Sequence, residues 1–108
     1  MLSIKQATEE LLATQSHNAI QSKQRESIMA LLKNSAAPLS RRQTQPGHLT
    51  VSGFILSPCH TWVLLIQHRK LGLWLQPGGN LDALDKSLIG TAAREISEET
   101  GLGAEHIK

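Results

Sequence analysis

The sequence predicts an α+β fold, in which two N-terminal helices precede a region of short strands that leads into a further helix. Three observations predict it. Apolar residues recur at helical spacing over residues 2–33. Short apolar runs bounded by turn residues follow over residues 49–76. Residues 85–101 return to helical spacing and end at a glycine, which suits the left-handed position just past a helix.

Length and composition favour one small globular domain over a disordered chain. The 108 residues are 40% hydrophobic and 19% charged. The formal net charge of +2 is slight and indicates no dedicated nucleic-acid surface, so we do not expect nucleic acid as a partner. The single cysteine, Cys59, cannot form an internal disulfide and fits a reducing compartment. No apolar run is long enough to span a bilayer, and we expect a cytoplasmic protein with no membrane partner.

The first 47 residues read as two helices and a linker. We expect helices over 2–16 and 19–33. Their inner faces would be Leu2, Ala7, Leu11 and Leu12 in the first, and Ile20, Ser27, Ile28, Leu31 and Leu32 in the second. The helices would cover the main domain, pair with another subunit or cap a substrate cleft. Residues 34–48 look like a linker, whose Arg41 and Arg42 either contact a phosphate or face solvent.

Three strands are expected next. Residues 49–57 and 62–67 would form a hairpin, and the continuous Val-Leu-Leu-Ile run in the second strand predicts burial on both faces. A short strand at 73–76 would bring Trp74 to the core or to a cleft wall.

The two connections beside this third strand carry candidate contacts. Arg69 and Lys70 precede it in a basic loop, where they either meet substrate phosphates or are ordinary exposed cations. Pro77, Gly78 and Gly79 follow it as a tight turn, in which the glycines allow close approach of the backbone.

The last helix carries three carboxylates on one face. Asp85 or Ser87 would cap its start, and its packing stripe would be Ile89, Ala93, Ile96 and Thr100. At helical spacing Glu95, Glu98 and Glu99 fall within an arc of roughly 100°. Their repulsion costs on the order of a few tenths of a kcal/mol per pair. A divalent cation such as Mg²⁺, which prefers oxygen ligands, would offset it; the alternative is a solvated acidic surface.

Residues 79–102 resemble the sequence box of the Nudix hydrolases. That box reads Gly, five residues, Glu, seven residues, then Arg-Glu-apolar-any-Glu-Glu-any-Gly-apolar. Residues 94–102, Arg-Glu-Ile-Ser-Glu-Glu-Thr-Gly-Leu, match its second half at every specified position. In the first half Asp85 replaces the glutamate, and eight residues rather than seven separate it from Arg94.

The resemblance implies a fold, an activity and a set of site residues. The fold would be an α/β/α sandwich with a mixed sheet, occupying residues 48–108 after the N-terminal segment 1–47. The activity would be Mg²⁺- or Mn²⁺-dependent hydrolysis of a pyrophosphate bond in a nucleoside diphosphate linked to another moiety. The metal ligands would be Glu95, Glu98, Glu99 and the carbonyl of Gly79. Catalytic roles would fall to Glu98, Glu99, Arg94 and Asp85. Apart from the resemblance, the two connections beside the third strand offer Arg69, Lys70 and Gly78 as candidate substrate contacts.

The resemblance also raises a question about completeness. In the family, further strands and a helix follow the box, whereas this sequence ends at Lys108. We therefore expect the N-terminal part of a Nudix domain, and an incomplete sheet leaves a homo-oligomer open. The alternative to an enzyme is a non-catalytic module that binds nucleotide or a protein partner.

Overall fold

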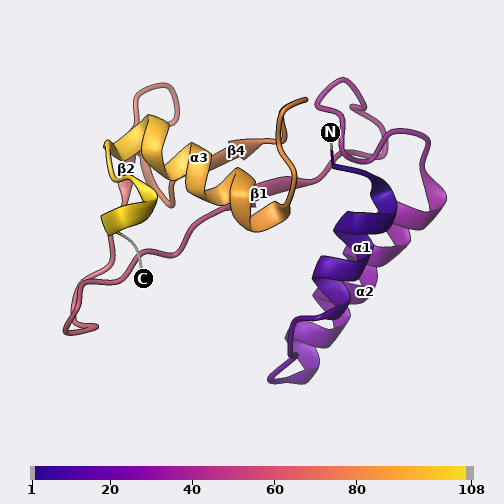
Figure 1. Ribbon diagram of the computed structural model, residues 1–108, viewed down its shortest axis with the longest axis horizontal. Coiled ribbons are helices and arrows are strands. Elements are labelled where there is room, and N and C mark those ends of the chain that lie inside the picture. Colours follow the sequence, from indigo (N-terminus) through magenta and orange to yellow (C-terminus); the bar gives the residue numbers. More distant parts are fainter. Residues whose placement is uncertain (1, 107–108) are drawn as a thin grey trace.

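The computed structural model describes residues 2–106 and confirms the α+β class (Figure 1). In chain order the elements are α1 (Ile4–Leu12), α2 (Ala19–Asn34), β1 (Thr50–Ser52), β2 (Ile66–His68), β3 (Leu73–Leu75), β4 (Gly78–Asn80), α3 (Leu88–Thr100) and a 3-10 turn, η1 (Ala104–His106). None of the helices within this described part of the chain is long and apolar enough to cross a membrane.

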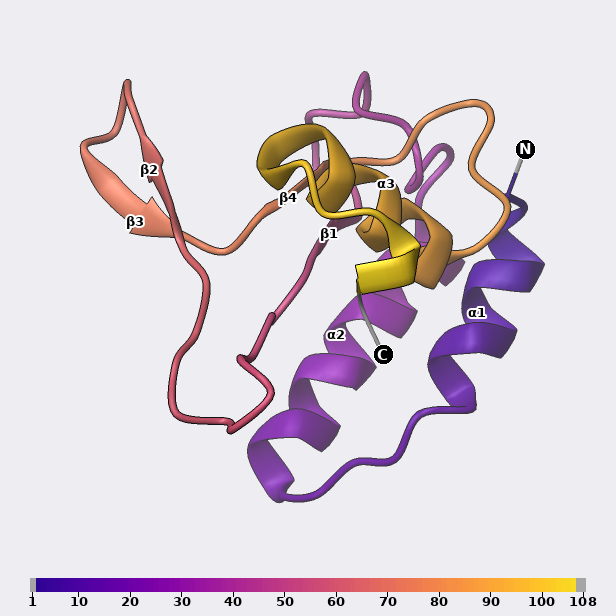
Figure 2. The ribbon, with the colours of Figure 1, turned by 60° about the vertical axis from the view of Figure 1, so that its left-hand side comes forward.

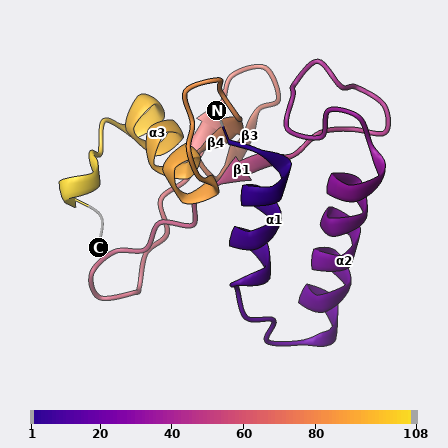
Figure 3. The ribbon, with the colours of Figure 1, turned by 45° about the vertical axis from the view of Figure 1, so that its right-hand side comes forward.

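Helices α1 and α2 lie side by side and run in opposite directions (Figures 1 and 3). A capping box of Ser3 and Gln6 starts α1, and the Asn18 side chain caps α2. The first helix ends at Leu12 rather than at residue 16, because the Thr14 hydroxyl donates to the carbonyl of Leu11 (2.6 Å) and closes the helix end.

A small hydrophobic core holds this helical pair against the chain that follows it. Its buried residues are Leu2, Ala7, Leu32 and Leu39, and Leu11, Ile28, Leu49, Leu81 and Leu88 pack partly against them. The predicted inner faces are wrong at Leu12 and Ile20, which are 57% and 70% exposed, and at Ser27, which is also exposed. The helices reach the core through the adjacent positions Leu11 and Ile28 instead. The expected linker is a packed segment, since its Pro38 and Leu39 are buried.

The strands form two separate antiparallel pairs rather than one mixed sheet. β1 pairs with β4, so that Val51 lies opposite Gly79, and β2 pairs with β3. The expected glycine turn is therefore part of a strand. Helix α3 packs on the β1–β4 pair, where Ile96 lies so close to Gly53 that a Cβ there would come within 2.5 Å of its Cδ1. This pair is what positions the site.

The observed strands are shorter than the predicted ones. The β2–β3 hairpin stands apart from the rest of the molecule (Figure 2). The predicted hairpin joining residues 49–57 to 62–67 survives as one bridge between Leu56 and Val63. The prediction that the Val-Leu-Leu-Ile run is buried on both faces is wrong, since Val63 is 40% and Leu65 39% exposed. The placement of Trp74 in the core or a cleft wall is also wrong, since it is 63% exposed. Among the described residues each strand of this hairpin pairs only with the other, and β3 is exposed along its whole length, so the hairpin has little cover from the rest of the chain.

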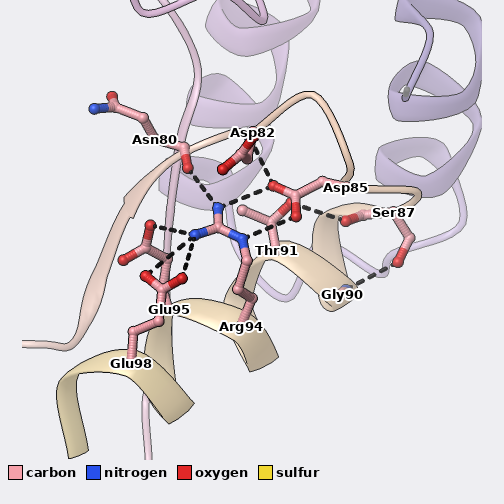
Figure 4. Close-up of polar contacts among 9 residues, drawn as sticks. All are labelled: Asn80, Asp82, Asp85, Ser87, Gly90, Thr91, Arg94, Glu95 and Glu98. Carbon is pink, nitrogen blue, oxygen red and sulfur yellow. Dashed lines mark hydrogen bonds and ion pairs between the residues drawn. The ribbon is translucent and has the colours of Figure 1, made fainter.

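Helix α3 has the predicted ends but a shifted packing face. Ser87 accepts a hydrogen bond from the N–H of Gly90 (2.9 Å) at its start, and Gly101 takes φ 78° at its end. The predicted stripe holds at Ile96, which is buried, but not at Ile89, which is 76% exposed. Thr91 is fully buried instead, and its side chain lies beside Asp85 of the loop before α3 (Figure 4).

Candidate active site

The guanidinium of Arg94 is the centre of a polar network that joins α3 to the loop before it and to β4 (Figure 4). Its Nε and Nη2 donate to the two carboxylate oxygens of Asp85, at 2.9 and 3.0 Å. Nη2 also donates to the backbone carbonyl of Asn80 (2.9 Å), and Nη1 donates to Glu95 (3.0 Å) and to both oxygens of Glu98 (3.3 Å). One cation therefore fixes the positions of three carboxylates.

Asp85 is the most deeply held of these carboxylates, at 6% exposed. It does not cap α3; its Oδ2 instead accepts from the N–H of Asp82 (2.7 Å) within the preceding loop. The hydrogen bonds from Arg94 lower the pKa of Asp85 to about 2, and that effect outweighs burial, which raises it. The same contacts raise the pKa of Arg94 above its ordinary value. The pair is therefore ionised at neutral pH.

The glycines of β4 give the glutamates room beside the strand. A Cβ at Gly79 would lie 2.7 Å from Oε1 of Glu95, so only glycine leaves space for this carboxylate. At Gly78 the backbone N–H donates to Oε2 of Glu99 (3.2 Å), and a Cβ would meet the carbonyl oxygen of Val51 on β1. The glycine pair is thus in direct contact with the acidic face of the helix.

These groups line one cavity of about 640 Å³. From β4, the loop after it and α3 come Gly78, Gly79, Asn80, Leu81, Asp82, Ala83, Arg94, Glu95, Glu98 and Glu99. The N-terminal segment contributes Leu2, Leu39, Ser40, Arg41 and Arg42. All three predicted metal-binding glutamates and both glycines therefore meet at the same cavity. Arg69 and Lys70 do not line it, because they lie in the β2–β3 turn that projects elsewhere.

In a comparison with family models, residues 46–108 match the NUDIX domain. The chain belongs to the Nudix family. At the level of the family this indicates hydrolysis of pyrophosphate bonds in nucleotide derivatives, with divalent metal ions. Comparisons with curated proteins and with solved structures find no match to this chain.

The residues of the Nudix box fit a hard divalent cation by the chemistry of their donors. Glu95, Glu98 and Glu99 offer only carboxylate oxygens, which Mg²⁺ and Mn²⁺ prefer. Within residues 2–106 no three His, Cys, Asp or Glu side chains are gathered tightly enough to form a ready-made metal cluster. Arg94 explains part of this, since it holds Glu95 and Glu98 by direct ion pairs.

The N-terminal segment supplies Nudix-site contacts that sequence reasoning missed. Glu10, on α1, accepts hydrogen bonds from the N–H groups of Leu88 (2.6 Å) and Ile89 (2.9 Å) at the start of α3. No local pattern signals this contact, which joins residues 78 and 79 positions apart. Arg41 and Arg42 were visible as a basic pair, but the sequence left open whether they face solvent or a ligand.

Proposed function

We propose that this chain binds Mg²⁺ or Mn²⁺ through Glu95, Glu98 and Glu99 and hydrolyses a pyrophosphate bond in a nucleoside diphosphate linked to another moiety. The observation that carries the proposal is the meeting of these three glutamates with the glycines of β4 at one cavity. A surface acidic patch would need neither the strand nor glycine at position 79, where a side chain would strike Glu95.

Each residue of the network has a distinct task in this proposal. Arg94 keeps Glu95 and Glu98 on the same side of α3, so that their charges converge despite repulsion. Asp85 holds Arg94 from the opposite side, and the Gly79 carbonyl is a further oxygen ligand. Glu99 or Glu98 accepts the proton of the attacking water. A divalent ion held by these oxygens would neutralise charge that develops on the phosphate oxygens and would make that water easier to deprotonate.

The test is phosphate release from a panel of nucleoside diphosphate derivatives with Mg²⁺ or Mn²⁺ added. Glu98→Gln keeps the shape of a side chain that is 59% exposed, so it should remove activity without unfolding the chain. Glu26→Gln on α2, which changes the same charge outside the cavity, is the matched control. Activity that survives Glu98→Gln would show that the ligand assignment is wrong.

A second measurement separates the enzyme from a non-catalytic nucleotide-binding module. Metal binding should raise the melting temperature of the wild type, because a ligand that binds only the folded state stabilises it. Glu98→Gln should reduce that rise and Glu26→Gln should not. No turnover across the panel, together with an unchanged melting temperature on adding either metal, would count against the enzyme.

A further inference from the structure

The arginine pair of the N-terminal segment lies in a turn that is fixed by hydrogen bonds. The Gln43 side chain accepts from the N–H of Ala37 (2.7 Å) and donates to the hydroxyl of Ser35 (3.1 Å) and the carbonyl of Gly47 (2.7 Å). Pro38, at the start of the turn, is buried, and its carbonyl accepts from the N–H of Leu49 (2.7 Å). The position of Arg41 and Arg42 is therefore set by the fold.

This turn is also tied to the strand that carries the site. His48 contacts the carbonyl of Gln43 through Nδ1 (3.1 Å) and the side-chain oxygen of Asn80 through Nε2 (2.9 Å). The backbone carbonyl of the same Asn80 accepts from Arg94. A continuous set of contacts thus runs from the turn that carries Arg41 and Arg42, through β4, to α3.

The charges of the cavity call for cations that face an anionic substrate. Four acids line it: Asp82, Glu95, Glu98 and Glu99. Of the three arginines that line the same cavity, Arg94 is already engaged by Asp85 and two glutamates. Within the part of the chain that the structure describes, no carboxylate pairs with Arg41 or Arg42. A diphosphate entering here would meet these two guanidinium groups as its available cationic partners.

We propose that Arg41 and Arg42 bind the diphosphate of the substrate from the N-terminal segment, in the cavity that the glutamates of α3 also line. Guanidinium groups suit this task because their planar fork matches two phosphate oxygens. The inference rests on the proposed function and deepens it, since it assigns the substrate's phosphate contacts to residues outside the box. Arg41 and Arg42 are then specificity residues, which act on binding of the anion rather than on the bond that breaks.

The test measures binding of inorganic pyrophosphate to the full chain by calorimetry in excess Mg²⁺. Arg41→Ala/Arg42→Ala should raise the dissociation constant roughly tenfold or more, because charge-assisted hydrogen bonds are lost. Lys23→Ala/Lys33→Ala removes two exposed charges from α2 outside the cavity and should leave the constant within about twofold of wild type. In hydrolysis, the arginine variant should raise KM more than it lowers kcat.

The outcomes distinguish this inference from the proposed function. Equal pyrophosphate affinity in the wild type and the arginine variant, or no binding by the wild type, would overturn the inference. Pyrophosphate binding that depends on the two arginines, with no hydrolysis of any substrate, would support the inference and contradict the proposed hydrolytic function. If the alanine pair does not fold, Arg41→Gln/Arg42→Gln gives the same comparison, because it removes both charges while keeping a shorter polar side chain with two of the five N–H donors at each position.

Discussion

Asp85, in the loop before α3, accepts two parallel hydrogen bonds, of 2.9 and 3.0 Å, from Arg94 on α3. The box differs from the family pattern at this pair, with a shorter acid and one more residue between the two positions. The differences are compatible with contact because Asp85 lies before the helix cap, in a loop that closes toward β4. The structure thus joins the two halves of the box through a side chain that the sequence made doubtful.

Replacing Asp85 by asparagine should destabilise the chain. The substitution keeps the size of the side chain but leaves part of the Arg94 charge without its buried partner, which costs about 2 kcal/mol or more. Denaturant unfolding measures the change. Asp82→Asn is the control, because Asp82 contributes only its backbone N–H to this contact. Equal stability of the two variants would contradict a bracing role for Asp85.

Stability should fall as the solution is acidified from about pH 4 to about pH 2. The folded pKa of Asp85, about 2, lies below the ordinary value of 3.8 because of Arg94. A carboxylate with a lowered pKa stabilises the fold above its unfolded pKa and loses that contribution as pH falls through the folded value. The loss is about 2 kcal/mol for this group. The free energy of unfolding, measured across this pH range, should therefore change less with pH for Asp85→Asn than for the wild type.

The two glycines of β4 should respond differently to alanine. At Gly79 a methyl group would displace the Glu95 carboxylate, so Gly79→Ala should weaken metal binding at least tenfold while the sheet persists. At Gly78 it would strike the backbone of β1, with Ser52 Cα only 2.6 Å away, so Gly78→Ala should chiefly lower stability. Calorimetric titration with Mn²⁺ and thermal unfolding would be measured on both variants. Weaker metal binding in Gly78→Ala together with lower stability in Gly79→Ala would contradict this assignment.

Removing the carboxylate of Glu10 should destabilise α3 from a distance. Glu10→Ala leaves the N–H groups of Leu88 and Ile89 without their acceptor and removes a negative charge from the positive end of the helix dipole. The expected cost is about 1 kcal/mol. Glu9→Ala, at the exposed neighbouring position, should cost less because that side chain makes no such contact. Hydrogen exchange at the first turn of α3 would report the change directly.

The parts of the molecule that the sequence predicts are those set by local chemistry. Ser87 and Gly101 bound α3 because a hydroxyl satisfies free N–H groups and glycine tolerates a positive φ. The glutamates of the box meet at one cavity because helical spacing places them on one face. Both results depend on residues close together in the chain.

The parts that sequence reasoning misses depend on contacts between distant segments. Periodicity places Ile89 and Ile96 on similar faces, but it does not reveal that only Ile96 finds a covering strand. An apolar run such as the one before β2 predicts burial only if another element packs on it. The approach of Arg41 to the cavity likewise depends on how the whole turn docks on β4.

The small core between the helical pair and the loop before α3 has a consequence for how heat would inactivate this protein. Leu81 and Leu88 pack against the core that contains Ala7 and Leu32, and Glu10 accepts a hydrogen bond from the N–H of Leu88 in the first turn of α3. In the proposed site, loosening either N-terminal helix would therefore shift the first turn of α3 and weaken binding of the divalent ion. A substitution at Ala7, which lies in that core and does not line the cavity, is therefore expected to show itself as metal binding that weakens on warming.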